Sequence, residues 1–537
     1  MTRFSPAFAL LALLPGLAAA GEPLPPIERV ELKVTAFHVN GKPFFPLMAW
    51  LQDAGNWPAV KACAMNTIAG YWPKSSGTRD VAEYLSLVEK AGLYGVMPFE
   101  PKLKGHPALL GYIHDDEPDL TQQVSDAVVE PAKHLRINRR TPLWKILDGD
   151  RTSWSVLDPL QDAAITIKLN APVTIEAIAL WPTISKGLAV PKEVVFSGDG
   201  AEILKVTVEN KKGEQRFPLP RPVTLKELTM RVASTYPGDQ EWGSIGEIEG
   251  LDNAGKNLLL SPPRTVPRAT PAQTLEKYKA MKAADPTRPI FMTLTGNFHP
   301  FFKRIPEELR AAYPDYVKAT DVIGYDIYPI YGWNKPEWIH LVQEATGLLV
   351  KMAAGKPVYA WIETSKGGQW TGALENQKEV TPAHIRAEVW MSITRGATAI
   401  GYFTHVWKPA YHQFGVPEAN RQAIREINEQ ITRLAPAILG AAPKQAVAIA
   451  AQGDTKLDLL AREGPSTSPA AGPDGLYLFA VNYDERLREA TATIKVEGLA
   501  AGTTVSVVDE GRTLKADAGS FTDAFAPLAV HIYKLPR

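Results

Sequence analysis

The stretch LLGYIHDDEP at residues 109–118 decides the fold. It begins with five apolar or small residues, which is typical of a short buried strand, and it continues directly into four ionisable residues before a proline. In barrels of parallel strands, catalytic groups lie where the strands end. The stretch therefore indicates a buried parallel strand with functional carboxylates at its carboxyl end.

The same pattern of short apolar strands recurs on both sides of this stretch. The eight expected strands are 44–50, 66–72, 93–99, 109–113, 289–294, 322–328, 357–362 and 399–403. Helices are expected at 56–64, 79–91, 270–284, 336–354 and 381–395. Strands that alternate with helices predict parallel βα units. The two parts, 27–137 and 265–437, total roughly 284 residues, close to the ~250 of a (β/α)8 TIM barrel. We therefore predict the α/β class.

Two other segments have a different character. Residues 142–262 contain short alternating strands without helices, which predicts a β-sandwich inserted after the fourth barrel strand. The strands expected there are 164–169, 175–180, 193–196, 204–208 and 228–232. Residues 440–537 are again all-β and predict a second sandwich after the barrel, with a surface loop at 466–474.

Composition limits the classes of partner. Among 537 residues, Lys plus Arg and Asp plus Glu both number 58, so there is no basic field of the kind that binds nucleic acid. A single cysteine excludes an internal disulfide framework. Residues 1–20 combine an early arginine, a short apolar run and small residues at the end, which predicts a cleavable export signal. We therefore expect a periplasmic or secreted protein without a membrane segment. An uncleaved anchor is the alternative, and the oligomeric state stays open.

Two glutamates follow strands that lie across a barrel mouth from each other. Glu117 follows the fourth strand and Glu363 follows the seventh, so both side chains can face one pocket. Glycoside hydrolysis uses such a pair, one carboxyl group protonated and the other ionised. Their mutual repulsion would raise the pKa of one of them. The sequence therefore predicts a glycoside hydrolase that needs no catalytic cofactor.

The barrel segments resemble clan A glycoside hydrolases, on the stretches HPALLGYIHDDEP (106–118) and YAWIE (359–363). The resemblance implies that Glu117 is the general acid/base, that Glu363 is the nucleophile, and that the configuration is retained. Many clan members have asparagine before the acid/base, whereas this chain has Asp116, so Asp115, Asp116 and Glu117 compete for the acid/base role. We assign Asp116 to substrate binding. A tyrosine after the sixth strand often contacts the nucleophile in this clan, which implies that role for Tyr328.

Other polar and aromatic residues near the strand ends are candidates for sugar contacts, although each is also explained by packing. The candidates are Trp50, Trp72, Asn297, Trp361, His405, Trp407 and His412. Asp326 lies within the sixth strand, and we expect it to be structural.

The inserted segment resembles discoidin domains, also called coagulation-factor type C modules, on WKILDGDRTSW (144–154), SGDG (197–200) and IGEIE (245–249). Such modules often bind sugars, and many hold a structural calcium ion. The resemblance places Asp148, Asp150, Thr152 and Glu247 at the calcium positions, with the hard oxygen ligands that calcium prefers. A metal-free Asp-Gly turn is the alternative.

Two other readings of the whole chain remain open. One is a non-catalytic carbohydrate-binding protein on a barrel scaffold. The other is a metal-dependent hydrolase that uses the ionisable residues at 114–117. Adjacent residues of a strand face opposite sides, so these four could bind one ion only if the chain bends there.

Overall fold

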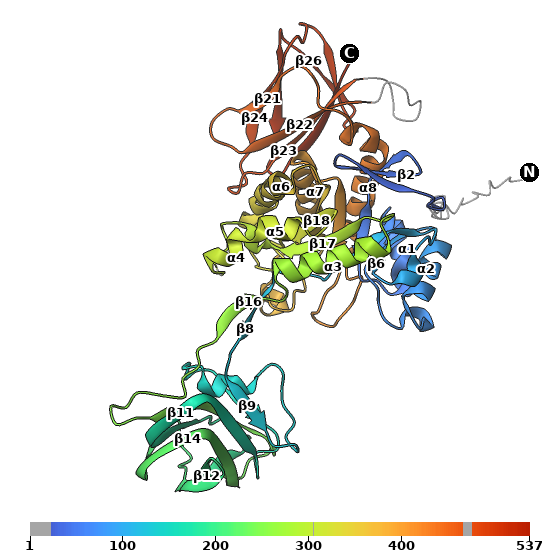
Figure 1. Ribbon diagram of the computed structural model, residues 1–537. Helices are drawn as coiled ribbons and strands as arrows, with labels where there is room; N and C mark the ends of the chain where they lie inside the picture. Colours follow the sequence, from blue (N-terminus) through green and yellow to red (C-terminus); the bar gives the residue numbers. More distant parts are fainter. Residues whose placement is uncertain (1–22, 304, 465–474, 537) are drawn as a thin grey trace, which may run out of the picture. The chain divides into compact units, whose positions relative to one another are not determined.

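The computed structural model describes residues 23–303, 305–464 and 475–536 (Figure 1). The predicted export signal and the predicted loop at 466–474 lie outside the described residues. The chain divides into two compact units. The first is formed by Met1–Leu120 together with Pro267–Arg537, and the second is formed by Thr121–Val266.

The first unit contains a closed barrel of eight parallel strands, as the sequence pattern predicts. In chain order these are β4 (Leu47–Trp50), β5 (Thr67–Ala69), β6 (Tyr94–Pro98), β7 (Leu109–Ile113), β17 (Ile290–Thr295), β18 (Val322–Asp326), β19 (Val358–Glu363) and β20 (Ala399–Phe403). The barrel closes where β20 pairs with β4. β7 and β17 are neighbours although the whole second unit lies between them in the sequence.

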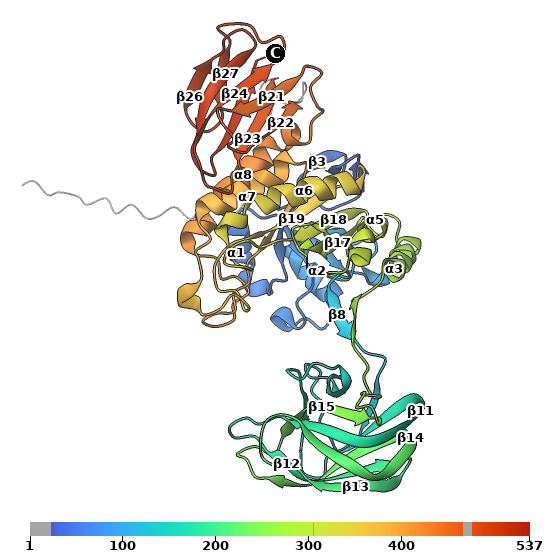
Figure 2. The same ribbon diagram turned by 90° about the vertical axis from the view of Figure 1, so that its left-hand side faces the viewer.

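Helices connect most of these strands (Figure 2). They are α1 (Trp57–Ala62), α2 (Val81–Lys90), α3 (Pro271–Ala284), α4 (Glu307–Ala311), α5 (Tyr313–Val317), α6 (His340–Ala353), α7 (Pro382–Thr394) and α8 (Glu418–Ile438). α3 begins with a capping box between Thr270 and Gln273, which satisfies otherwise free main-chain donors. Between β6 and β7 there is only the short 3-10 helix η3 (Pro101–Leu103). No helix in the described ranges is long and apolar enough to cross a membrane.

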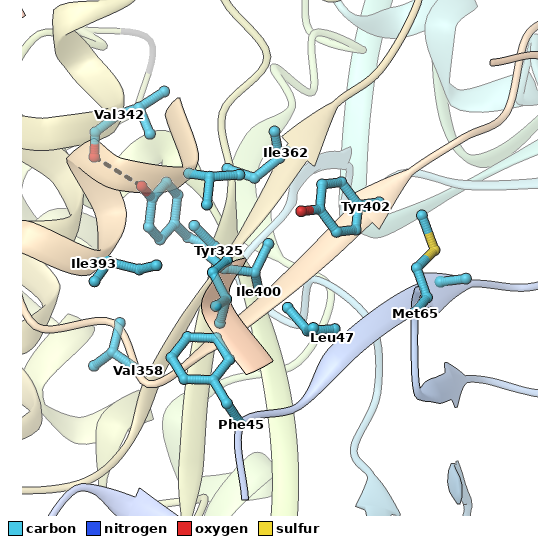
Figure 3. Close-up of a cluster of buried hydrophobic side chains, with 14 of the residues drawn as sticks. Phe45, Leu47, Met65, Tyr325, Val342, Val358, Ile362, Ile393, Ile400 and Tyr402 are labelled. Atoms are coloured by element: carbon cyan, nitrogen blue, oxygen red, sulfur yellow. Dashed lines mark hydrogen bonds between the residues drawn. The ribbon is translucent and has the colours of Figure 1, made fainter. Parts of the chain in front are cut away.

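Side chains alternate between two apolar layers along the barrel strands. One layer packs against the helices, and Figure 3 shows part of it, with the Tyr325 hydroxyl donating to the carbonyl of Val342. The other layer fills the barrel interior and includes Phe291, Tyr359 and Trp361. An antiparallel sheet, β1 (Val30–Lys33), β2 (Ala36–Val39) and β3 (Lys42–Phe44), adds Phe37 to the interior layer, where its ring stacks on Phe291 at 5.6 Å.

The C-terminal part of the first unit consists of two antiparallel sheets. The three-stranded sheet contains β21 (Val447–Ala451), β24 (Ala490–Val496) and β27 (Ser520–Phe525). The five-stranded sheet contains β22 (Leu457–Glu463), β23 (Leu476–Asn482), β25 (Thr504–Val507), β26 (Arg512–Lys515) and β28 (Val530–Leu535). Phe479 of β23 stacks on the buried Trp390 of α7 at 5.5 Å, which joins these sheets to the barrel helices.

The second unit is an antiparallel sheet with an apolar core of its own. Its strands are β9 (Val128–Pro131), β10 (Ser155–Leu157), β11 (Ala164–Pro182), β12 (Val190–Gly198), β13 (Ala201–Thr207), β14 (Gln215–Tyr236) and β15 (Gly243–Leu251). The predicted strands at 164–169 and 175–180 are one strand, β11, which continues through two irregular register shifts against β14. A separate two-stranded ribbon, β8 (Thr121–Val124) with β16 (Arg264–Pro267), forms where the chain enters and leaves this unit.

Candidate functional site

The candidate site is the barrel mouth, by which we mean the residues at and just after the carboxyl ends of the eight barrel strands. At the end of β18, Tyr325 faces the helices, where its hydroxyl contacts Val342 and Thr346. Because strand neighbours face opposite sides, Asp326 faces the barrel side. Its register partner on the next strand is Trp361, a member of the interior layer.

The backbone of Glu117 has an unusual conformation. Its φ of +48° lies in the left-handed region, which costs a non-glycine residue roughly 1–2 kcal/mol. Its N–H donates to the carbonyl of Thr293 on β17 at 3.1 Å, which fixes the turn against the barrel. Strained residues of this kind cluster at functional sites. The Arg268 guanidinium lies 3.6 Å from the Glu117 carboxylate and also donates to the carbonyl of Asp116 at 3.4 Å.

The carboxyl group next to Glu117 is that of Asp326. The two carboxyl groups are close enough to interact with each other. Burial, followed by the charges of Glu117 and Asp116, raises the pKa of Asp326 well above its ordinary value of 3.8. Asp326 therefore keeps its proton to a higher pH than a free aspartate does. We expected Asp326 to be structural, whereas the structure places it in the carboxylate cluster.

Two further aspartates surround this pair and have different roles. Asp116 is exposed, and partial loss of water together with the charge of Glu117 raises its pKa to about 7. Asp119 is buried and accepts hydrogen bonds from the N–H and hydroxyl of Thr295 and from the hydroxyl of Tyr313. Burial raises the pKa of Asp119 to about 6. Asp116 is thus the accessible member of the cluster, and Asp119 holds β17 and α5 in place.

Glu363 has surroundings that differ from those of Glu117. Its side chain has no exposed surface, and its carboxylate accepts hydrogen bonds from the main-chain N–H groups of Ile330 and Tyr331. Its nearest carboxyl group is that of Glu388 on α7. Burial raises the pKa of Glu363 to about 7. In this conformation Glu363 is closed off from solvent, and the carboxyl groups paired at the mouth are those of Glu117 and Asp326.

Aromatic side chains form a continuous path from the carboxylates outward. The Tyr328 ring lies 5.0 Å from Phe403, and Phe403 stacks on Trp407 at 6.0 Å with an interplanar angle of 8°. Trp407 lies 5.4 Å from Tyr411, which stacks on Trp72 at 6.3 Å. All five side chains retain some exposure. Burial and then the charges of Asp326 and Glu117 raise the pKa of Tyr328, so the path begins beside the carboxyl pair.

The other predicted sugar contacts are placed as follows. Trp50 is half-buried and meets Trp361 edge to face at 5.2 Å. Trp361 is 4% exposed, and its indole N–H donates to Thr293, so it packs inside the barrel. His405 is 3% exposed and bonds the carbonyl of Trp50, which ties β20 to β4. Asn297 is half-buried in the turn after β17. His412 is exposed.

Sequence reasoning missed Trp370, which is 84% exposed. It lies in the segment after β19, where Gln377 accepts from the N–H groups of Gly367 and Gly368 and donates to the carbonyl of Gly372. The carbonyl of Gly367 also accepts from the N–H of Trp407. Trp370 is therefore carried by a well-bonded segment whose main chain contacts that of Trp407. The sequence signal that could have indicated Trp370 was the pair Gly367 and Gly368 shortly before it.

Two of the groups needed for the metal-dependent alternative are already engaged by helix α3. His114 is buried and bonds the carbonyl of Thr274 on α3, and Asp115 pairs with Lys277 of the same helix. Within the described ranges, no three His, Cys, Asp or Glu side chains are grouped so that they could hold a metal ion.

The predicted calcium residues of the second unit fit a cation in part. Glu247 has no exposed surface; its Oε1 accepts from Gly149 N–H, whereas its Oε2 is buried without a partner among the described residues. Burial, followed by the charges of Asp148 and Glu249, raises the pKa of Glu247 to about 8. The orphaned oxygen beside Asp148 suits a cation. Asp148 itself accepts from the N–H of Asp150 and the hydroxyl of Ser153, and Asp150 accepts from the N–H and hydroxyl of Thr152.

Comparison with known proteins gives a limited result. No family model matches the chain, and no curated protein matches it. A family 32 carbohydrate-binding module of AlyQ, in complex with 4,5-unsaturated mannuronic acid, is 12% identical, with 24% of this chain and 95% of that chain covered at a TM-score of 0.20.

A family 32 module from C. perfringens NanJ, in complex with galactose, is 14% identical over 24% of this chain and 97% of that chain, at a TM-score of 0.19. A pectin-binding module is 20% identical over 25% of this chain and 94% of that chain, also at 0.19. At these TM-scores, the matches establish no function for this chain.

Proposed function

We propose that the barrel mouth binds a carbohydrate and hydrolyses its glycosidic bond, on a barrel of the (β/α)8 type. This proposal depends on the interaction between the carboxyl groups of Glu117 and Asp326. Two carboxyl groups in contact cannot both ionise easily, so one keeps its proton toward neutral pH. A protonated acid beside an ionised one is what the cleavage of a glycosidic bond requires.

In this proposal Glu117 is the proton donor. It is the better placed of the pair, because 22% of its side chain is exposed and its strained backbone holds it at the mouth. Burial and the charges of Glu117 and Asp116 hold the proton on Asp326, which passes it to Glu117 as Glu117 protonates the leaving oxygen. After the leaving group departs, Asp326 stabilises positive charge on the sugar or activates water. The separation of the two carboxyl groups with substrate bound decides the stereochemistry, with ~5–5.5 Å giving retention and ~6.5–9.5 Å giving inversion.

Glu363 does not attack the sugar in this proposal. A nucleophile must reach the anomeric carbon, whereas Glu363 has no exposed surface and accepts hydrogen bonds from two main-chain N–H groups. Asp326 takes its place as the second carboxylate of the pair. The aromatic path from Tyr328 to Trp72 supplies flat apolar faces for several sugar rings.

Three further proposals concern residues 1–20 and the second unit. Residues 1–20 direct export to the periplasm or the medium, as their pattern indicates. The second unit binds carbohydrate in the manner of discoidin modules. It also holds a structural calcium ion through Asp148 and Glu247, because a buried carboxylate oxygen there has no protein partner among the described residues.

The experiment is a screen of chromogenic glycosides and polysaccharides with the purified protein, followed by Glu117→Gln. We expect the variant to lose about 100- to 10,000-fold in kcat, which is the usual contribution of a general acid. Asp115→Asn is the matched control, because Asp115 pairs with Lys277 on α3 and lies outside the Glu117–Asp326 contact. Full activity of Glu117→Gln would refute the assignment. Loss of activity in Asp115→Asn alone would favour the metal-dependent reading.

A non-catalytic carbohydrate-binding barrel is the second candidate. The closed position of Glu363 favours it, because the usual clan A nucleophile is then out of reach. Saccharide binding by calorimetry, without turnover in either wild type or Glu117→Gln, would select this reading over hydrolysis.

A further inference from the structure

We propose that Glu388 is a positioning residue for the barrel mouth: its carboxyl group holds that of Glu363, which clamps the segment after β18 that carries Tyr328 and Tyr331. This inference rests on the proposed function for its consequence, but the clamp itself can be measured without any activity.

The clamp joins three elements. Glu363 is the last residue of β19, Glu388 lies in the middle of α7, and Ile330 and Tyr331 belong to the segment after β18. The Glu363 carboxylate accepts from Ile330 N–H at 2.9 Å and from Tyr331 N–H. Neither glutamate has any exposed surface. Two main-chain donors on one carboxylate fix the position of the whole segment.

Glu388 must supply a proton to this arrangement. In the described part of the chain, neither of its carboxyl oxygens finds a donor in hydrogen-bonding geometry. The groups that act on Glu388 are the carboxyl group and the main-chain N–H of Glu363. A buried carboxylate without a donor is costly, and two adjacent buried carboxylates are costlier still. The stable arrangement is a protonated Glu388 that donates to an ionised Glu363.

The clamped segment leads directly to the proposed site. The Tyr331 ring lies 6.0 Å from Tyr328 and 5.4 Å from Phe403, the two rings that begin the aromatic path. The carbonyl of Tyr331 accepts from the hydroxyl of Thr371, in the segment that carries Trp370. A shift of Ile330 and Tyr331 would therefore move the first sugar-binding surface beside Asp326.

The clamp should weaken as pH rises. The titratable side chains that face it from packed elements are Tyr325 toward Glu388 and Tyr331 toward Glu363, and both are neutral because burial raises their pKa values. The pair alone therefore titrates. Burial raises the pKa of Glu363 to about 7 and that of Glu388 well above 4.5, so Glu363 ionises first and Glu388 holds the shared proton to higher pH. Once the shared proton is lost, two charges face each other in a closed space, and the segment should open.

Hydrogen exchange of the full chain, followed by mass spectrometry on peptides that cover residues 327–335, tests the clamp. In wild type, we expect the protection factors of these amides to fall with rising pH, by up to about tenfold per pH unit above the pKa at which the shared proton is lost. Glu388→Gln should keep the protection and remove its pH dependence, because an amide donates to Glu363 permanently. Glu363→Gln should lower the protection at every pH, since an amide oxygen is a weaker acceptor than a carboxylate.

Glu337→Gln is the matched control, because Glu337 is an exposed glutamate that pairs with Lys335 at 3.5 Å. It should reproduce the wild-type profile. Protection that is independent of pH in wild type, or a pH dependence that persists in Glu388→Gln, would overturn the clamp. If the clamp is confirmed but no saccharide is hydrolysed, the proposed function fails and the positioning role stands.

Discussion

The buried Glu247 permits a worked prediction about metal and stability. In the unfolded chain its pKa is about 4.5, and in the folded unit burial raises it to about 8. Between these values the folded state keeps a proton that the unfolded state has lost, so stability falls as pH rises. At 1.36 kcal/mol per pH unit, the loss at pH 7 reaches up to about 3 kcal/mol. Glu247→Gln should avoid this loss, since an amide oxygen can still accept from Gly149 N–H.

The assay is calorimetric unfolding of the full chain between pH 4 and 9, with EDTA or with millimolar calcium. In EDTA, Glu247→Gln should match wild type near pH 4 and exceed it by up to about 3 kcal/mol at pH 7. Calcium should stabilise wild type and leave the variant unchanged, because binding to the folded state alone raises stability.

Glu249→Gln is the control on the same strand, since Glu249 pairs with Arg151 at 3.2 Å. Equal pH slopes for wild type and Glu247→Gln would refute the reasoning from burial. A calcium response that Glu247→Gln retains would refute the assignment of Glu247 as a ligand.

Two further predictions concern the barrel. Trp370→Ala should weaken polysaccharide binding several-fold in calorimetry and leave small chromogenic glycosides unaffected, because the ring is 84% exposed at the outer end of the mouth; equal losses for both kinds of ligand would contradict an outer subsite. Phe479→Ala should destabilise the first unit by about 3–5 kcal/mol in urea unfolding, since its buried ring stacks on Trp390. An unchanged midpoint would show that this contact does not hold the C-terminal sheets to the barrel.

The strands of the barrel could be predicted from local sequence patterns. Short apolar runs ending in polar residues identified all eight strands, and helix signals such as Thr270 with Pro271 marked α3 to within one residue. These features depend on periodicity and capping, which act over a few neighbouring residues. The predicted strands at 164–169 and 175–180 merged into β11 because only pairing with β14, about fifty residues away, keeps the strand continuous.

The sequence alone determined that carboxylates stand at the ends of the barrel strands, because a hydrophobic run and the residue after it are local facts. Only the tertiary structure decided which carboxylates meet. Asp326 joins Glu117 because its strand neighbour Tyr325 faces the helices, and Glu363 is closed off because the segment after β18 and helix α7 fold over it. Both outcomes depend on contacts between residues that are far apart in the chain, and burial then sets which carboxyl groups keep their protons.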